Sequence, residues 1–345
     1  MANIYDVAKR AAVSVATVSA VINRSSFVSQ TLHERVQRAI SELNYSPNLL
    51  ARSLAQRKTH TLGILIPDVA NPYFPEIVRG AEDKASEAGY MIILGNSDNQ
   101  ISKEEMYLNL FLSKRVDGIL LVKAAGDLNN ALFEMLHRTG PPLVLIDREY
   151  PRLRVDTVVA DDSGGGYAAT QHLLKLGHRR IGIITGIPNA STTQGRLLGY
   201  REALAARGVP FNDDLIVQGD YGIESGYTAG LALLTQAPSA VFVTNYMMTI
   251  GFMKALDKQK LRCPQDVAVV SYDDFTWNDI FHPKLTSVVQ PKYMLGYRAA
   301  EMLLSRIHHK HKRVRLEVLK NDFVVRESSG VKVEKNRKSA GAGSS

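Results

Sequence analysis

The chain has 345 residues, of which 45% are hydrophobic and 22% are charged. This composition excludes a largely disordered chain, and no apolar run approaches the length of about eighteen residues that marks a membrane-spanning helix. The single cysteine, Cys263, excludes a disulfide framework within the chain. Because the first residues lack the basic start and apolar stretch of an export signal, we expect a cytoplasmic protein that does not enter a membrane.

The net charge of +8 is concentrated at the two ends of the chain. Residues 1–60 carry eight lysines and arginines against three aspartates and glutamates, and residues 326–345 carry five against two. The rest of the chain is formally neutral. A basic leading segment on a neutral body favours contact of that segment with a polyanion such as nucleic acid. The alternative is a solvated surface that happens to be basic.

Two short helices are predicted at the start of the chain. Asn3 and Asp6 are typical of a helix-starting cap, and apolar residues then recur at helical spacing as far as Ala11. After a short turn, Ser14 is predicted to cap a second helix. In that helix the residues expected to face inward are Val18, Val21 and Ile22, and those expected on the other faces are Val15, Ala16, Thr17, Ser19, Ala20 and Asn23.

A third helix is predicted to begin after Ser29. Its apolar stripe consists of Leu32, Val36, Ile40 and Leu43. Three short helices with a tight turn between the first two describe a helix-turn-helix domain, whose second helix enters the major groove of DNA. Small three-helix bundles also serve as protein-interaction modules, so spacing alone leaves both interpretations open.

The residues themselves resemble the lactose/galactose-repressor (LacI/GalR) family of bacterial transcription regulators. The similarity lies in the segments Ile4-Tyr5-Asp6-Val7-Ala8, Val13-Ser14-Val15-Ala16-Thr17-Val18-Ser19, Val21-Ile22-Asn23, Asn44-Tyr45-Ser46-Pro47-Asn48 and Ala51-Arg52-Ser53-Leu54. It extends over nearly the whole chain. The resemblance implies a DNA-binding head, a hinge and an effector-binding core, which act as a homodimer or a tetramer on an operator.

The family likeness also implies which residues of the head contact DNA. Base edges are expected to face Val15, Ala16 and Ala20, whereas phosphates are expected to contact Tyr5, Ser14, Thr17, Asn23 and Ser29. Relatives commonly place a polar residue at the position of Ala20. Because a methyl group cannot make the bidentate contact of arginine with guanine, base readout should depend partly on thymine methyls. Ala12 stands in the turn where relatives often have glycine or asparagine, and a left-handed backbone there would cost about 1 kcal/mol.

Residues 47–60 are expected to form the hinge. Pro47 is suited to a helix start. Taken alone, the segment indicates only a linker with some helical propensity. The resemblance implies instead a hinge helix that pairs with its symmetry mate and inserts Leu54 between base steps in the minor groove. Residues 1–46 then form the helix-turn-helix domain, and residues 331–345 are predicted to be a disordered basic tail. The tail lacks a leucine heptad, which favours a dimer over a tetramer.

Residues 61–330 alternate short apolar runs with helical segments. The runs that predict strands are 62–66, 91–94, 118–122, 143–146, 181–184, 240–243 and 267–270, and the predicted helices are 76–88, 103–114, 128–138, 166–176, 196–207, 224–234, 247–258 and 292–307. This pattern predicts an α/β core of two doubly wound parallel-sheet subdomains, similar to the type I periplasmic binding proteins. We expect one half to contain 61–160 plus 291–320, and the other 161–290 plus 321–330.

A small-molecule effector is expected in the crevice at the carboxyl ends of these strands. The candidate binding residues there are Asp68, Asn71, Tyr73, Phe74, Asp147, Arg148, Arg196, Tyr221, Asn245, Asp273 and Gln290. Carboxylates and amides suit hydroxyl groups, arginine suits paired oxygens, and aromatic faces cover the apolar side of a sugar ring. They also match motif positions of ribose-type binding proteins. We therefore expect a sugar or sugar derivative.

Departures from the family pattern keep other effectors open. The segments Arg52-Ser53-Leu54 and Leu94-Gly95-Asn96 resemble purine-responsive repressors, yet Arg148 and Ala190 replace the pocket residues of those repressors. Arg148 and Trp277 would also suit an anionic or aromatic compound. Tyr246 stands where the family usually has aspartate, so the pocket polarity or the adjacent helix cap is expected to differ.

The sequence contains no motif that requires catalysis, metal or a cofactor. Gly164-Gly165-Gly166 lacks the spacing of a dinucleotide fingerprint and is interpreted as a loop that leads into a helix. The histidines at 308, 309 and 311 are interpreted as a solvated loop. We predict a regulator and not an enzyme, with no cofactor and no metal; an enzyme that uses Asp147 and Asp273, and an exported sugar-binding protein, are the rival classes.

Overall fold

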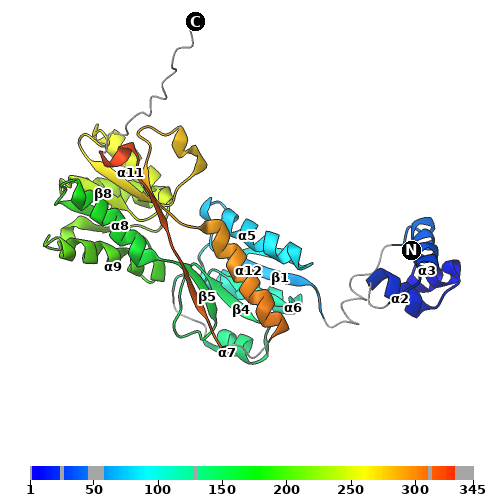
Figure 1. The fold of residues 1–345 in the computed structure, drawn as a ribbon. Helices are drawn as coiled ribbons and strands as arrows, with labels where there is room; N and C mark the ends of the chain where they lie inside the picture. The colour runs from blue at the N-terminus through cyan, green and yellow to red at the C-terminus, as the bar shows by residue number, and fades with distance from the viewer. Residues whose placement is uncertain (1, 24–26, 46–57, 127–129, 310–312, 331–345) are drawn as a thin grey trace, which may run out of the picture. The chain divides into compact units, whose positions relative to one another are not determined.

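The computed structural model describes residues 2–23, 27–45, 58–126, 130–309 and 313–330. The chain divides into two compact units, Met1–His60 and Thr61–Ser345 (Figure 1). Most of the predicted hinge, with Leu54, and the predicted disordered tail lie outside the described residues. Within the described residues, no helix has the length and apolar character that crossing a bilayer requires.

The first unit contains the three predicted helices, α1 (Ile4–Ala11), α2 (Val15–Asn23) and α3 (Gln30–Glu42). The predicted cap of α1 is confirmed, since Asn3 Oδ1 accepts from the amides of Tyr5 and Asp6 and the Asp6 carboxylate accepts from the Asn3 amide. Ser14 Oγ accepts from the Thr17 amide at 3.1 Å and so caps α2, as predicted. Ser29 precedes α3 but makes no side-chain cap bond.

The small core of this unit differs in part from the predicted stripes, since Ile22, Ile40 and Leu43 are also only half-buried. Val7, Val18 and Val36 are fully buried. On α3 the buried partner of Val36 is Ala39, which lies three residues later on the same face, whereas Leu32 is only half-buried. Val15, predicted to lie on an outward face, is half-buried against this core.

The turn between α1 and α2 requires a left-handed backbone. Ala12 has φ 49° and ψ 51°, and its amide donates to the carbonyls of the last turn of α1. Arg35 of α3 donates from Nη2 to the carbonyl oxygens of Ala11 and Ala12 at 2.6 and 3.1 Å, which fixes this turn against the third helix. Ala12 therefore has the left-handed backbone for which the sequence analysis expected a cost.

The first half of the second unit is built on a six-stranded parallel sheet in the order β11-β5-β4-β3-β1-β2. Its strands are β1 (Thr61–Ile66), β2 (Met91–Asn96), β3 (Gly118–Leu121), β4 (Leu143–Ile146), β5 (Asp156–Ala160) and β11 (Leu316–Leu319). Its helices are α5 (Tyr73–Glu87), α6 (Ile101–Ser113), α7 (Asn130–Thr139) and α12 (Lys292–His308).

The second half repeats this plan with the order β12-β10-β9-β8-β6-β7, in which only β12 is antiparallel to its neighbour. Its strands are β6 (Ile181–Thr185), β7 (Ile216–Gln218), β8 (Ala240–Val243), β9 (Ala268–Tyr272), β10 (Thr286–Val289) and β12 (Asp322–Val324). Its helices are α8 (Asp162–Lys175), α9 (Ser191–Ala206), α10 (Ile223–Leu234) and α11 (Tyr246–Lys258), and 3₁₀ turns cover Asp213–Leu215, Thr276–Asp279 and Glu327–Ser329.

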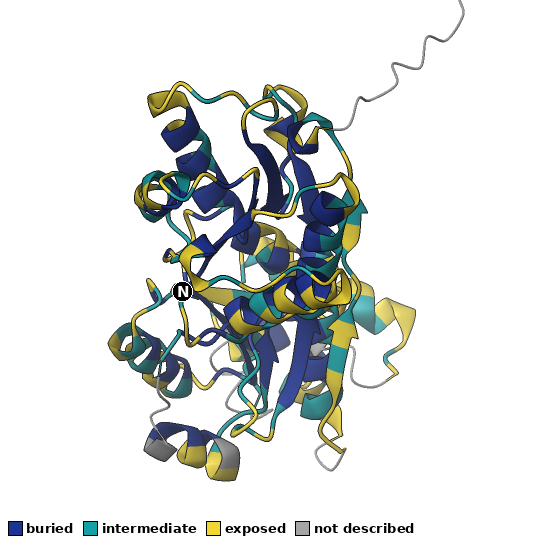
Figure 2. Cartoon of the chain, turned by 90° about the vertical axis from the view of Figure 1, so that its left-hand side faces the viewer, coloured by how far each residue is buried: buried dark blue, intermediate teal, exposed yellow. Residues whose placement is uncertain are grey.

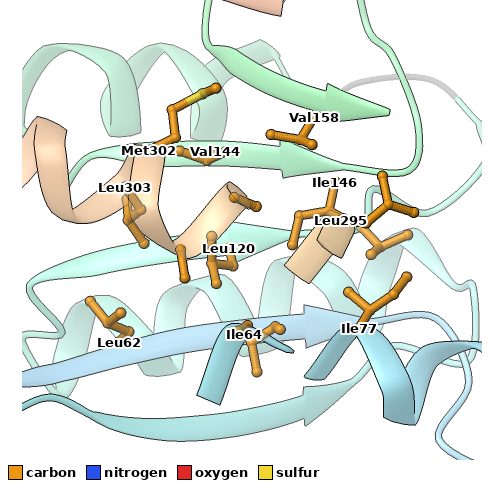
Figure 3. Close-up of a cluster of buried hydrophobic side chains, with 14 of the residues drawn as sticks. Leu62, Ile64, Ile77, Leu120, Val144, Ile146, Val158, Leu295, Met302 and Leu303 are labelled. Atoms are coloured by element: carbon orange, nitrogen blue, oxygen red, sulfur yellow. The ribbon is translucent and has the colours of Figure 1, made fainter. Parts of the chain in front are cut away.

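Helix α12 returns to the first half, as predicted. Leu295, Met302 and Leu303 pack against residues of β1, β3, β4 and β5 in one continuous apolar cluster (Figure 3). The chain therefore crosses between the halves after β5, after β10 and after β11. In Figure 2 the strands of both halves are mostly buried and exposed residues gather on the outer faces of the helices.

The prediction of a loop at Gly164-Gly165-Gly166 was wrong, because these residues form the first turns of α8. Their small size serves helix packing. A Cβ on Gly166 would lie 2.3 Å from the Arg196 carbonyl oxygen, and one on Gly199 would lie 2.0 Å from that of Ser163. The two glycines thus let α8 and α9 approach closely, and this contact sets the position of Arg196.

Candidate functional site

A cavity of about 390 Å³ lies between the two halves of the second unit. All eleven residues that the sequence nominated for effector binding line it, namely Asp68, Asn71, Tyr73, Phe74, Asp147, Arg148, Arg196, Tyr221, Asn245, Asp273 and Gln290. The sequence missed Pro67, Asp98, Asn99, Ile187, Thr192, Asp220 and Gly222, which also line it. The missed polar residues lie in loops after β2 and β7 or at the start of α9.

Two cavity carboxylates follow strands in a strained backbone conformation. Asp147 follows β4 and Asp273 follows β9, with φ 69° and 73° respectively. At Asp147 the Arg148 amide donates to the Ile146 carbonyl at 2.7 Å, which closes a tight turn around the aspartate. Such a three-residue turn at positive φ is rare and strained, although aspartate tolerates positive φ better than most residues do. The turns aim both side chains into the cavity.

A chain of hydrogen bonds joins these two aspartates across the halves. Tyr73 Oη lies 2.6 Å from Asp147 Oδ1 and 3.1 Å from Gln290 Oε1, and Gln290 Nε2 donates to Asp273 Oδ1 at 2.6 Å. Burial, and next the charge of Asp147, raises the pKa of the Tyr73 phenol well above its usual value. Burial also raises the pKa of Asp273. The phenol therefore stays protonated and bridges the carboxylates through neutral groups.

Arg196 of α9 is anchored on every side. Its Nε donates to Asp162 Oδ1 at 2.7 Å, its Nη1 donates to the Thr244 carbonyl at 2.7 Å, and its guanidinium stacks 3.9 Å from the centre of the Tyr272 ring. Burial raises the pKa of Asp162 to about 7, and the nearby Arg196 opposes this rise. The Arg196 guanidinium is thus held by a carboxyl group, a backbone carbonyl and an aromatic face.

Arg148 is held less completely. Its Nη1 donates to Asn99 Oδ1 at 2.7 Å and to the Lys123 carbonyl at 2.8 Å. Its Nε is buried without a hydrogen-bond partner among the described residues and lies 3.9 Å from Asp147 Oδ2. Because this nitrogen is itself buried, a ligand oxygen could accept from it only if the side chain shifted toward the cavity.

The segment that holds Arg148 rests on a fully buried ion pair. Lys123 follows β3, and its Nζ lies 2.8 Å from Glu104 Oε1 of α6. The other oxygen of Glu104 accepts from the Ala124 amide at 2.5 Å, and Tyr150 Oη donates to the Ala124 carbonyl. Burial raises the pKa of Glu104, although Lys123 opposes the shift. Sequence reasoning missed this pair, because neither residue belongs to a motif.

The remaining polar residues of the second half are also fixed in place. Tyr221 Oη lies 2.9 Å from Thr192 Oγ1 and 2.5 Å from Thr193 Oγ1. Asn245 Oδ1 accepts from the Met248 amide and caps α11, so the helix retains a side-chain cap beside Tyr246. Tyr246 packs against Phe275 and Trp277. Neither Trp277 nor Ala190 is among the residues that line the cavity.

Asp68 and Asn71, which lie between β1 and α5 of the first half, complete the site. Asp68 is exposed, and its Oδ1 accepts from the Ala70 amide. Asn71 Oδ1 accepts from the Tyr73 amide at the start of α5, and the Tyr73 and Phe74 rings meet edge to face with centres 5.1 Å apart. The cavity therefore offers carboxylates, amides and aromatic faces but, within the described residues, no group of His, Cys, Asp and Glu that could hold a metal ion.

The residues nominated for DNA contact lie on the first unit. Tyr5, Ser14, Ala16 and Ser29 are exposed, Thr17 and Ala20 are half-buried, and Val15 packs partly on the core. Ser14 Oγ lies 2.9 Å from Thr17 Oγ1, so their hydroxyls form a pair at the start of α2. Asn23 ends α2, but its side chain lies outside what the structure describes, as does Leu54.

Two family models match the chain. "Bacterial regulatory proteins, lacI family" matches residues 3–48, and "Periplasmic binding proteins and sugar binding domain of LacI family" matches residues 59–324. The chain is 42% identical over 317 residues to the HTH-type transcriptional repressor PurR of Erwinia tasmaniensis, with 90% of this chain and 92% of that protein covered.

Two further proteins are similar over nearly their whole length. The ribose operon repressor of Haemophilus influenzae is 38% identical over 330 residues, which cover 95% of this chain and 98% of that protein. A structure of the lac repressor dimer bound to operator and the anti-inducer ONPF has a TM-score of 0.85 at 26% identity and covers 95% of this chain and 99% of its own. The chain belongs to the LacI family of bacterial regulatory proteins.

Proposed function

We propose that this regulator binds a pseudo-palindromic DNA operator as a homodimer, and that a sugar or sugar derivative in the cavity controls its affinity for DNA. The observation that carries the effector class is the cavity lining, in which carboxylates and amides from both halves surround the rings of Tyr73, Phe74 and Tyr221. Such groups exchange hydrogen bonds with vicinal hydroxyls while the rings cover apolar ring faces. The similar ribose operon repressor supports the same class.

The head is proposed to read DNA through α2 in the major groove. Val15, Ala16 and Ala20 would face base edges, and Tyr5, Ser14, Thr17, Asn23 and Ser29 would contact phosphates. Because Ala20 offers only a methyl group, base readout is proposed to use thymine methyls in part. Leu54 is proposed to wedge between central base steps, and Leu54→Ala is expected to weaken specific binding more than tenfold with the fold intact. Unchanged operator affinity would refute the wedge.

The homodimer is supported by an unpaired apolar surface on the first half. Strand β2 is an edge strand, and its residues Met91, Ile93 and Leu94 are exposed together with Met106 and Leu110 of α6. Edge strands and contiguous apolar side chains are typical of interfaces between copies. The lac repressor of similar structure is a dimer on its operator. Two heads on one dimer would require a pseudo-palindromic site.

Regulation is proposed to act through closure of the cavity. A ligand that binds both halves favours the closed arrangement, and the halves then shift at the dimer interface, so that hinge pairing over DNA changes. Either induction or corepression follows from this scheme, since each needs only different affinity for the two states.

Isothermal titration of the full chain against pentoses, hexoses, sugar acids and purines tests the effector class. We expect heat from a neutral sugar, and heat from purines alone would replace the sugar assignment. The same mixtures, recovered chemically unchanged, would separate a binder from an enzyme. The bridging of Asp147 and Asp273 by Tyr73 and Gln290 supports binding, because it engages an oxygen of each carboxyl group with a neutral hydrogen-bond donor.

A further inference from the structure

The hydroxyl of Tyr73 occupies a position where a ligand hydroxyl would be recognised. Its oxygen lies 2.6 Å from Asp147 Oδ1 and 3.1 Å from Gln290 Oε1, and all three residues line the cavity. A carboxylate oxygen and an amide oxygen that converge on one point can each accept from a hydroxyl group placed there. Here the protein itself supplies the hydroxyl.

The Tyr73 hydroxyl faces two acceptor oxygens but can donate only one proton. A phenol has one proton, and the shorter, charge-assisted contact directs it to Asp147. Gln290 directs Nε2 to Asp273 Oδ1 at 2.6 Å, and with an ionised Asp273 the reversed amide would place two acceptors together. Gln290 Oε1 therefore receives only the weaker share of the phenol proton, at 3.1 Å, and can accept a second hydrogen bond.

Tyr73 cannot leave this position easily. Its side chain is 5% exposed, its ring meets Phe74 edge to face, and its amide is held by Asn71 at the start of α5. A ligand hydroxyl directed at Asp147 Oδ1 would therefore meet the phenol oxygen in a fixed place. A neighbouring ligand hydroxyl can still donate to Gln290 Oε1.

We propose that Tyr73 determines effector specificity by filling one hydroxyl subsite, so that the cavity selects a sugar with no hydroxyl on the carbon that faces Tyr73. The effector class is then a deoxy sugar, or an epimer whose hydroxyl at that carbon points away. This inference rests on the proposed sugar-controlled function. Loss of the phenol oxygen alone reopens the subsite, because Asp147 Oδ1 and Gln290 Oε1 are then both free to accept.

The test is isothermal titration of the full-length wild type and Tyr73→Phe with D-ribose, D-allose, D-glucose and D-galactose and the series of their analogues that each lack one hydroxyl. At one ring position we expect the wild type to bind the deoxy analogue at least as tightly as its parent. Tyr73→Phe should shift that ratio at least tenfold toward the parent. The matched control is Tyr200→Phe, which removes a buried hydroxyl bonded to the Ile181 carbonyl in the second half and should leave every ratio unchanged.

Ratios that agree within twofold between wild type and Tyr73→Phe at every position would overturn the inference while leaving a sugar effector intact. The absence of heat from every sugar with either protein would overturn the proposed function and this inference with it. If circular dichroism shows that Tyr73→Phe does not fold, the wild type alone decides. A tenfold preference for the parent sugar at every position then contradicts an occupied subsite.

Discussion

The two halves of the core each bring one buried arginine to the same cavity, and the two are held in opposite ways. Arg196 of the second half has a carboxylate at 2.7 Å, a carbonyl and an aromatic face. Arg148 of the first half has two oxygen acceptors on Nη1, and its Nε has no partner among the described residues. In the second half, Arg196 is thus fixed by contacts within the protein. In the first half, Arg148 keeps hydrogen-bonding capacity that a ligand could use.

Because of its more complete contacts, we expect Arg196 to contribute more than Arg148 to the free energy of unfolding. Arg196→Met leaves Asp162 buried without its cation, which should lower the free energy of unfolding by about 3–5 kcal/mol at pH 8. Arg148→Met loses two hydrogen bonds to neutral acceptors and a loose 3.9 Å contact with Asp147, and should cost about 1–2 kcal/mol. Urea unfolding of the full-length variants measures both values. Equal costs would show that the two arginines are held alike.

Arg148, which is expected to matter less than Arg196 for stability, is expected to matter more for effector binding. Arg148→Met removes a guanidinium from the cavity lining and should weaken effector binding more than tenfold while the protein stays folded. The control is Arg262→Met, which breaks an exposed ion pair with Asp266 and should change nothing. Titration calorimetry measures the dissociation constants, and an unchanged value for Arg148→Met would contradict the role given to the first half.

A pH series sharpens the description of the second half. Because burial raises the pKa of Asp162 to about 7 in the folded protein, the folded state binds its proton more readily than the unfolded chain does. Its contribution to stability is therefore complete below about pH 4 and is lost as the pH rises toward 7. The free energy of unfolding of the wild type, relative to Asp162→Asn, should fall by about 2 kcal/mol between pH 5 and 7. Parallel curves for the two proteins would contradict this.

The smallest expected effect lies in the first unit. Ala12→Gly relieves a left-handed backbone and should stabilise the α1–α2 turn by up to about 1 kcal/mol. Native-state hydrogen exchange of the α1 amides in the full chain measures it, with Ala16→Gly on exposed α2 as the control that should destabilise. Faster exchange in Ala12→Gly would mean that the turn bears no strain.

The long apolar strands of the core could be predicted from the sequence, whereas the short strands could not. The long apolar strands and the polar residues directly after them were predicted correctly, because parallel strands end at one edge of a sheet. Strands β5, β7, β10, β11 and β12 were missed. Several are only three or four residues long, and β11, at the sheet edge, is partly exposed, so none has a long apolar run.

Long-range pairings were beyond sequence reasoning. Asp98 and Asn99 reach the cavity from a loop with consecutive positive φ values, which no periodicity signals. The partner of Arg196 is Asp162, 34 residues earlier, and the pair forms because glycines let α8 and α9 approach closely. Residue types at strand ends predict that a cavity is polar, whereas the order of its hydrogen bonds depends on packing.

Selection of duplexes from a random library by the full-length protein, followed by titration with the sugar that binds, tests the account most directly. We expect a salt-sensitive preference for an inverted repeat. The sugar should change this affinity at least tenfold in the wild type and much less in Arg148→Met. Equal affinity for all duplexes, or a sugar effect that is the same in both proteins, would contradict control of DNA binding from this cavity.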